Sequence, residues 1–264
     1  MYEFNYHRAT SLESAAEIYS QSEDPVYLAG GMTLIPTLKQ RLAKPSDVID
    51  LSGVDGLSDV KQSAETLTIG SMTTHAAVAA NSVVSSIIPA LSALAGGIGD
   101  PHVRNKGTLG GSVANNDPSA DYPAALVGLD AIVITNQREI PAEEFFIGMF
   151  ETSLVEGELI SHVRFNIPDK AAYMKFANPA SRYAIVGVMV AKFPGEVRVA
   201  ITGAGPAVFR SGEMEQALAS EFSIGAIDGV KVAPDELNSD IHAGQEYRAN
   251  LVSVMAARAV EMCG

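Results

Sequence analysis

The feature that most constrains this chain is a glycine-rich stretch at residues 96–121, which reads GGIGDPHVRNKGTLGGSVANNDPSAD. It holds six glycines and almost no large apolar side chain, so a hydrophobic core cannot fix its conformation. A segment this long is either a flexible linker or a backbone shaped around a ligand. We favour the ligand, because Gly110 and Gly111 allow positive φ angles and a close approach of the backbone to another group.

Polar side chains surround this glycine pair. The hydroxyls of Thr108 and Ser112 flank it, and successive N–H groups in such a turn can form a concave anion site. Amides and carboxylates suited to sugar hydroxyls follow at Asn115, Asn116, Asp117 and Asp121. A second glycine pair lies in residues 28–33, LAGGMT, and two small-residue loops around one diphosphate are the simplest joint interpretation. The alternative is two ordinary tight turns, since short glycine motifs often occur by chance.

Composition indicates a globular protein and excludes some partners. The chain has 264 residues, enough for one large domain or two to three small ones. Apolar residues make up 47% and charged residues 19%, which is not the composition of a disordered chain. The net charge of −13 argues against a nucleic-acid or anionic-membrane partner, because both need a positive surface. It does not exclude an anionic ligand held by local N–H groups.

Reactive side chains are sparse. The single cysteine, Cys263, permits neither an intrachain disulfide nor an iron–sulfur cluster held by the chain's own thiolates. The histidines are scattered without an i, i+4 pair, so we expect no metal site. We assign no catalytic residue, since neither a serine nucleophile elbow nor a phosphate-loop lysine motif is present. Without a signal segment or an apolar run that could span a bilayer, we expect a cytoplasmic protein.

Periodicity predicts a mixed order of strands and helices in the first half. In residues 1–55 we expect strands at 2–6, 26–29 and 48–51, a helix at 12–20 opened by a capping box in Thr10–Glu13, and a helix from residue 34. The 28–33 loop then lies between a buried strand and a helix N-terminus, which favours an anion. It lacks G-x-G-x-x-G, so a Rossmann fold is not assigned.

The remaining elements follow from the same patterns. In residues 56–168 we expect a hairpin at 58–63 and 67–70, helices at 76–80, 87–94 and 123–129, a helical turn at 143–146, and strands at 131–135 and 159–167. A polar break follows at 168–170. Beyond it we expect a meander of strands at 173–176, 185–193 and 196–202, then helices at 211–219 and 246–262. In the last helix Tyr247, Leu251, Met255, Ala259 and Met262 form an apolar stripe, typical of core.

Several motifs together resemble one family, the flavin-binding (medium) subunits of the molybdenum hydroxylases of carbon monoxide and xanthine dehydrogenase type. Residues 29–33, AGGMT, are similar to that family's first FAD loop, and residues 103–112, VRNKGTLGGS, to its second. The acidic segment 117–121, DPSAD, is similar to the one that follows the second loop. The similarity continues at residues 152–160, 202–210 and 240–251, so it covers nearly the whole chain.

The resemblance implies an α+β fold and a cofactor. Residues 1–168 would form a two-subdomain FAD-binding domain of the vanillyl-alcohol-oxidase/PCMH type, with subdomains at about 1–55 and 56–168. Residues 169–264 would form a small C-terminal domain of a three-stranded antiparallel sheet and helices. FAD would lie between the two subdomains with its diphosphate on the two loops. The implied cofactor-binding residues are Ala29, Gly30, Gly31, Met32, Thr33, Leu34, Ala95, Thr108, Gly110, Gly111, Ser112, Asn115, Asp121, Ile160, Lys175 and Tyr183.

Some of these residues carry a specific implied role. Asn115 and Asp121 would hold sugar hydroxyls, Ala95 would pack near the flavin, and Ile160 would line the pocket. Asp121 has a second interpretation, as a plain N-cap of the helix that follows it.

The flavin face is implied for Tyr183, with Lys175 nearby. Here too an alternative is open, because Tyr183 can be an ordinary strand residue packed in the sheet. The sequence also departs from the family twice. Met32 stands where a polar residue is usual, and residues 180–182, ASR, precede Tyr183 where an acidic residue is common.

The resemblance further implies a division of labour among subunits. A molybdenum–pterin large subunit would oxidise the substrate and an iron–sulfur small subunit would carry electrons, which fits a chain with one cysteine. FAD in this subunit of a heterotrimer would pass the electrons to an acceptor such as NAD or a quinone. Two alternatives stay open: a self-contained FAD-dependent oxidase, and a flavin-free assembly or scaffold subunit.

Overall fold

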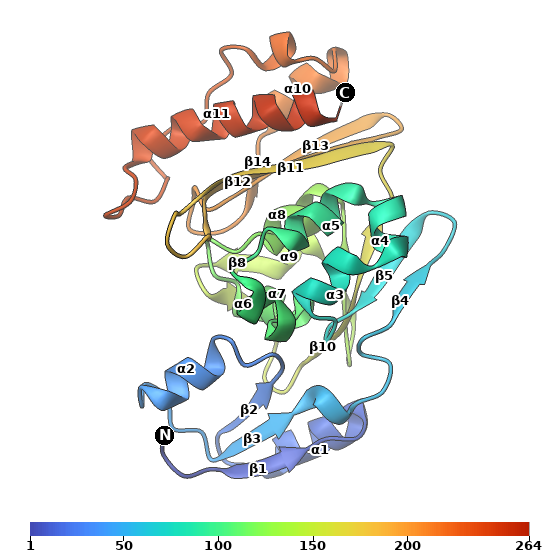
Figure 1. Cartoon of the computed structure of the whole chain (residues 1–264), viewed down its shortest axis with the longest axis vertical. Coiled ribbons are helices and arrows are strands. Elements are labelled where there is room, and N and C mark those ends of the chain that lie inside the picture. Colours follow the sequence, from blue (N-terminus) through green and yellow to red (C-terminus); the bar gives the residue numbers. More distant parts are fainter. Residues whose placement is uncertain (264) are drawn as a thin grey trace.

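The computed structural model describes residues 1–263 (Figure 1). Its N-terminal part is a parallel sheet in the order β1-β3-β2, made by β1 (Asn5–Arg8), β2 (Pro25–Leu28) and β3 (Asp47–Asp50). Helices α1 (Leu12–Gln21) and α2 (Leu34–Lys39) connect the strands, and η1 (Leu51–Gly53) follows them. The strand expected at residues 2–6 begins at Asn5, and β2 is half-buried where a buried strand was expected.

The capping box of α1 forms one residue later than expected. Ser11 is the N-cap, which makes Ser14 the third helical residue, and these two residues close the box. The Ser11 hydroxyl accepts from the Ser14 N–H at 3.1 Å, and the Ser14 hydroxyl accepts from the Ser11 N–H at 3.0 Å. Glu13 therefore has no part in it, although a carboxylate in the first helical turn remains favourable.

The middle of the chain forms an antiparallel sheet in the order β4-β5-β10-β6-β7. Its strands are β4 (Val60–Gln62), β5 (Thr66–Gly70), β6 (Ile132–Thr135), β7 (Glu139–Pro141) and β10 (Ile160–Asn166). Helices α3 (His75–Ala80), α4 (Ser82–Ile87), α5 (Pro89–Gly96), α8 (Tyr122–Gly128) and α9 (Ala142–Phe145) accompany it, with a hairpin of β8 (Phe146–Gly148) and β9 (Glu151–Thr152). The helix expected at 87–94 corresponds to α5, which begins at Pro89, a residue favoured at the first helical position. Residue 87 instead ends α4, a helix that was not expected.

The glycine-rich stretch folds into two short helices, α6 (Pro101–Lys106) and α7 (Leu109–Asn115). The positive φ angles expected at Gly110 and Gly111 are wrong, because both residues lie in the first turn of α7. Their lack of a side chain serves packing instead: a Cβ on Gly110 would lie 2.4 Å from the Cβ of Ser71. In this stretch the glycine with a positive φ is Gly99, at 50°, and in the first loop it is Gly31, at 71°.

The C-terminal sheet has the order β11-β12-β13-β14, with β11 (Lys170–Ala177), β12 (Ala184–Phe193), β13 (Glu196–Thr202) and β14 (Phe209–Arg210). The expected three-stranded sheet thus gains a fourth strand at its edge. The sequence did not indicate β14, because a two-residue strand is too short to show a periodic pattern. Helix α10 (Gly212–Ser220), η2 (Ile224–Ile227) and α11 (Gln245–Met262) follow, and α11 lies across one face of the sheet (Figure 1).

The two faces of this sheet belong to different cores. Under α11, residues such as Val188 pack with Leu251 and Met255. The predicted stripe is therefore right at its centre and wrong at its ends, where Tyr247 is 46% and Met262 68% exposed. On the other face Met189 joins the core of the middle part. The domain boundary at residue 168 stays a prediction, and no helix within residues 1–263 is long and apolar enough to cross a membrane.

Candidate functional site

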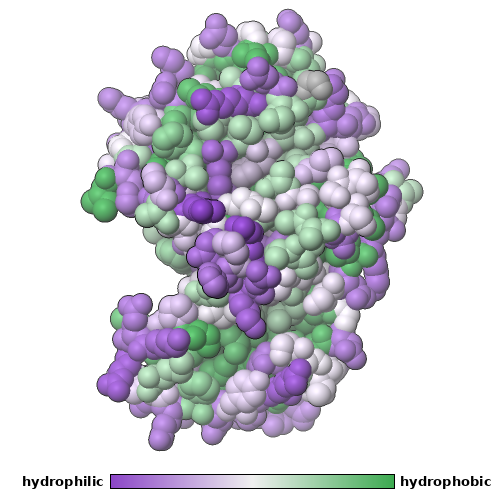
Figure 2. Space-filling view, in the orientation of Figure 1, coloured by the Kyte–Doolittle hydropathy of each residue, from purple (hydrophilic) through white to green (hydrophobic). Residues whose placement is uncertain are grey.

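A cavity of about 640 Å³ lies where the first glycine loop, α7 and the middle sheet meet. This volume is within the range of about 300–1,000 Å³ that is usual for ligand pockets. Figure 2 shows the surface indented where the N-terminal part meets the rest of the molecule. Fourteen of the sixteen expected residues line the cavity: Ala29, Gly30, Gly31, Met32, Thr33, Leu34, Thr108, Gly110, Gly111, Ser112, Asn115, Asp121, Ile160 and Tyr183. Ala95 and Lys175 do not line it.

The first loop offers backbone donors to the cavity. Within residues 1–263, the N–H groups of residues 30–33 make no hydrogen bond. Thr33 is the N-cap of α2 but provides no side-chain cap, and in the described chain the Leu34 N–H also stays open. The next helical N–H, that of Ile35, donates to the Gly31 carbonyl at 3.0 Å. Unpaired N–H groups ahead of a helix are favourable partners for an anion. The loop therefore has open N–H donors, and anion binding there stays a prediction.

The second loop does not offer open N–H groups to the cavity. The N–H groups of Leu109 and Gly110 donate to the carbonyls of Thr73 and Ser71 at 3.0 and 2.8 Å. Those of Gly111 and Ser112 donate to Thr108, through its hydroxyl at 3.1 Å and its carbonyl at 3.0 Å. The expected N–H nest at Gly110–Gly111 is therefore wrong, because the chain itself uses these donors to hold α7 against the strand end at Ser71.

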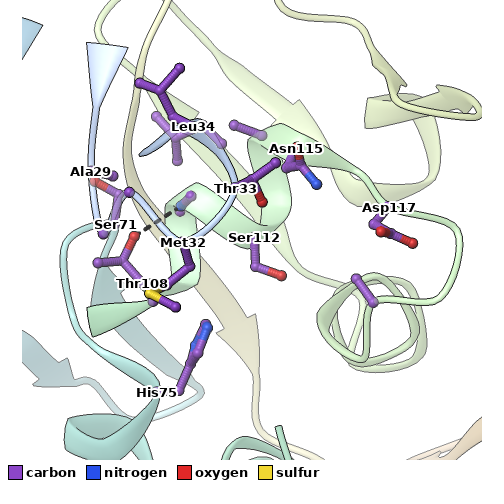
Figure 3. Close-up of a pocket in the computed structure, with 18 of the residues that line it drawn as sticks. Ala29, Met32, Thr33, Leu34, Ser71, His75, Thr108, Ser112, Asn115 and Asp117 are labelled. Atoms are coloured by element: carbon purple, nitrogen blue, oxygen red, sulfur yellow. Dashed lines mark hydrogen bonds between the residues drawn. The ribbon is translucent and has the colours of Figure 1, made fainter. Parts of the chain in front are cut away.

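Helix α7 contributes side chains to the cavity. Figure 3 shows Ser112 and Asn115 of α7 beside Thr33 of the first loop. Within residues 1–263 neither the Ser112 hydroxyl nor the Asn115 amide forms a side-chain hydrogen bond. The Thr108 oxygen accepts from Gly111, and its own O–H remains free to donate outward. A row of hydroxyl and amide groups suits the hydroxyls of a sugar or sugar alcohol.

Sequence reasoning missed a polar group at the wall of the cavity. Ser71 and His75 line it, and the Ser71 hydroxyl, the Thr73 hydroxyl and His75 Nδ1 are buried without a hydrogen-bond partner in the described chain. Burial, together with the nearby Arg104 guanidinium, lowers the pKa of His75 to about 4, so the imidazole is neutral at pH 7. The signal in the sequence was the polar run that directly follows a strand at Gly70.

Asp121 belongs to a buried network at one end of the cavity. Its carboxylate is 4% exposed and accepts from the Tyr173 hydroxyl at 2.6 Å and from Lys175 Nζ at 2.9 Å. Burial raises the pKa of Asp121, and the Lys175 ammonium opposes the rise. Asp121 precedes α8, but its side chain accepts no helix N–H. The alternative that Asp121 serves as a plain N-cap is therefore wrong.

Tyr183 stands between two cavities. It lines the large one and also a polar cavity of about 200 Å³, which Asn178, Asp240 and Arg248 line as well. Tyr183 comes before β12 and is 45% exposed, so it is not packed within the sheet as the alternative required. Burial of the rest of the side chain raises the pKa of its hydroxyl.

The groups that line the cavity indicate which kind of ligand it can hold. Open N–H groups at one wall, hydroxyls and amides along α7, and apolar side chains such as Leu34 and Ile160 suit an elongated molecule with an anionic centre and ring systems. Within residues 1–263 no group of three or more histidine, cysteine or acidic side chains is placed to bind a metal ion. Fold and site together define a protein that holds a nucleotide cofactor.

Solved structures with this fold cover the whole chain. The structure of quinoline 2-oxidoreductase from Pseudomonas putida 86 has a TM-score of 0.89 at 27% identity, covering 99% of this chain and 97% of that one. Carbon monoxide dehydrogenase from Hydrogenophaga pseudoflava gives 0.87 at 28% identity, with the same coverage. The nicotine 6-hydroxylase medium subunit of Paenarthrobacter nicotinovorans is 33% identical, over 98% of this chain and 96% of its own.

Residues 2–169 match the family described as the FAD binding domain in molybdopterin dehydrogenase, and the chain belongs to this family. The resemblance seen in the sequence is thus confirmed, together with FAD as cofactor and an α+β fold with an FAD-binding domain. The chain is a flavoprotein subunit of an oxidoreductase. These relatives favour that function over a self-contained oxidase or a flavin-free scaffold.

Proposed function

We propose that FAD occupies the 640 Å³ cavity and that the residues lining it are its contacts. The observation that carries the proposal is the set of open N–H groups at residues 30–33, all of which line this cavity. These N–H groups would hold the diphosphate. The hydroxyls of Thr108 and Ser112, with the Asn115 amide, would take the sugar hydroxyls.

This assignment changes the roles of the two loops. The first loop supplies backbone donors, and the second supplies side chains on a helix that is held firmly by its own backbone bonds. Met32, which stands where a polar residue is usual, contributes its N–H, for which its side chain is irrelevant. The departure at Met32 therefore leaves this backbone donor in place.

We further propose that the chain works in a complex with a molybdenum–pterin subunit and an iron–sulfur subunit as a cytoplasmic heterotrimer. Supporting this are relatives described as medium subunits or chains, of nicotine 6-hydroxylase and of carbon monoxide dehydrogenase. Bound FAD supplies the step from single-electron carriers to an acceptor such as NAD or a quinone. The chain's own residues bind and orient the cofactor and need no general base.

The position of the one cysteine supports clusters held elsewhere. Cys263 is 6% exposed and its Sγ lies 3.9 Å from the carbonyl oxygen of Val190, at the end of α11. Burial raises the pKa of this thiol to about 11, so it is not a ready thiolate ligand. Electrons from an iron–sulfur cluster must then come from another chain.

The experiment is co-purification of the tagged chain with the products of candidate partner genes, followed by iron, molybdenum and flavin analysis. We expect iron and molybdenum to co-purify with the chain, and a Cys263→Ser control to retain the same iron content. We also expect the FAD-loaded chain alone not to oxidise small alcohols or aldehydes. Turnover by the isolated chain would establish the self-contained oxidase and overturn the proposal.

A further inference from the structure

Lys175 makes three hydrogen bonds that join three separate segments. Its Nζ lies 2.9 Å from a carboxylate oxygen of Asp121, 2.9 Å from the carbonyl oxygen of Gly97, and 2.9 Å from that of Arg182. An ammonium group has three N–H donors, so these acceptors use all of them. The side chain is only 12% exposed and lines neither cavity. Lys175 thus has no donor left for a ligand.

Each acceptor belongs to a different part of the cavity's surroundings. Asp121 precedes α8, Gly97 ends α5, and Arg182 lies in the turn of residues 178–183 between β11 and β12. The buried carboxylate of Asp121 needs a counter-charge, because an unpaired buried charge is strongly unfavourable. Lys175 provides this counter-charge, and its bond to the Arg182 carbonyl also holds the turn in place.

Hydrogen bonds of Asn178 also hold the turn, and Lys175 adds one at the residue that is strained. Arg182 has φ of 64°, a left-handed conformation that is uncommon for a residue with a side chain. Its N–H donates to the carbonyl of Asn178 at 2.9 Å, and its carbonyl accepts from Lys175. Such a conformation persists when surrounding bonds over-determine it. Without Lys175 the carbonyl of Arg182 loses its only side-chain partner in the described chain.

The residue that follows Arg182 is Tyr183, which lines both cavities. The conformation at Arg182 sets the direction in which the backbone leads to Tyr183. Lys175 bonds the carbonyl of Arg182, and the peptide unit of that carbonyl leads directly to Tyr183 at the cavity wall. The geometry assigns to Lys175 the part of a positioning residue: it fixes the 178–183 turn, and so Tyr183, without touching the cofactor.

This inference rests on the proposed function only for the identity of the molecule beside Tyr183. It also differs from the role implied by the family resemblance, in which Lys175 is itself one of the cofactor contacts. The two roles predict different results, because a contact residue affects cofactor binding directly, whereas a positioning residue first affects the mobility of the turn.

The test is amide hydrogen exchange of the full chain, measured by mass spectrometry with and without saturating FAD. In Lys175→Met, which keeps the apolar stem and removes all three donors, we expect amides of residues 178–184 to exchange roughly tenfold faster or more. Amides of β4 and β5, remote from the turn, should exchange as in the wild type. Lys170→Met is the matched control, on an exposed lysine of the same strand, and should leave the turn unchanged.

Lys175→Arg supplies a second test that does not depend on the methionine variant folding. A planar guanidinium keeps the charge beside Asp121 but cannot place three donors in the same directions, so we expect turn exchange faster than in the wild type. Wild-type exchange in 178–184 for either folded variant overturns the inference, most clearly if flavin is lost at the same time. A wild-type chain that binds no FAD would contradict the proposed function, and the exchange result in the flavin-free chain would still decide the role of Lys175.

Discussion

Gly30 lies directly against the backbone carbonyl of Lys106, so closely that a Cβ on Gly30 would be 2.0 Å from that oxygen. The same Cβ would be 2.8 Å from the Cα of Gly107. The first loop and the end of α6 therefore meet backbone to backbone, and this contact fixes the N-terminal part against the middle of the chain. The cavity forms beside this junction.

Gly30→Ala should for this reason open the junction. Real Cβ atoms do not approach a backbone oxygen so closely, so the two segments must move apart, which we expect to destabilise the fold by about 1–3 kcal/mol or more. We also expect loss of bound flavin. Gly212→Ala is the matched control, since nothing lies within 4 Å of the added Cβ. Equal melting temperatures and equal flavin content of the two variants would contradict this account of the junction.

Ser112→Ala and Asn115→Ala should weaken FAD binding without weakening the fold. Neither side chain has a hydrogen-bond partner within residues 1–263, so its loss removes only contacts to a ligand. Each change should raise the dissociation constant about 2- to 10-fold, as for one hydrogen bond. Titration with FAD after flavin removal measures this. Asn105→Ala is the control, because that amide bonds Pro101 outside the cavity; unchanged affinity in both test variants would argue against the assigned sugar contacts.

His75 should make the fold sensitive to acid. Its pKa is lowered to about 4 in the folded chain, against about 6.5 when unfolded. The unfolded chain then binds the extra proton, so this stability is complete above pH 6.5 and is lost as the pH falls towards 4, by about 3 kcal/mol at most.

Denaturation of wild type and His75→Leu at pH 7.5 and 4.5 isolates this contribution. The stability lost between the two pH values should be smaller in the variant by about 2–3 kcal/mol. His102→Leu, at an exposed position in α6, should lose as much as the wild type. Equal losses in wild type and His75→Leu would mean that His75 is not buried as a neutral group.

Arg198 should hold the C-terminal sheet to the middle part. It is 5% exposed, donates to the Val127 carbonyl at 3.1 Å, and pairs with Glu143 and with Asp130. Arg198→Met removes a buried charge-assisted bond to that carbonyl and the partner of both carboxylates, so we expect a loss of about 1–3 kcal/mol in unfolding free energy. Arg164→Met, which breaks an exposed pair with Glu139, should lose less than about 1 kcal/mol. Equal losses of unfolding free energy in the two variants would show that the burial of Arg198 does not contribute to stability.

Much of the fold follows from local pattern. Residue periodicity identified the long strands β12 and β13 and the helix α11, because these elements bury many apolar side chains on one face. It failed at short elements, since β14 has two residues and α6 and α7 lie in a stretch with few apolar residues. Their formation depends on tertiary contacts, which no local pattern records.

The site shows the same limit. The sequence identified the two loops, but it assigned the N–H donors to both of them. Which N–H groups stay open depends on the carbonyls of Ser71 and Thr73, which are more than thirty residues distant along the chain and occupy the donors of Leu109 and Gly110. The hydrogen bonds of Lys175 were likewise not predictable, because two of its three acceptors, Asp121 and Gly97, lie 54 and 78 residues away along the chain.

The central claim is that this cavity holds FAD, and the most direct measurement is the visible absorption spectrum of the purified chain. The spectrum is recorded before and after adding excess FAD and desalting, for the wild type and for Gly31→Val, whose added side chain would sit at a φ of 71° and lie 2.8 Å from Ile35. We expect the wild type to retain flavin bands at about one equivalent, as for a single cofactor site, and the variant to retain none. A normal flavin complement in Gly31→Val, or none in wild type co-purified with its partners, would contradict the account.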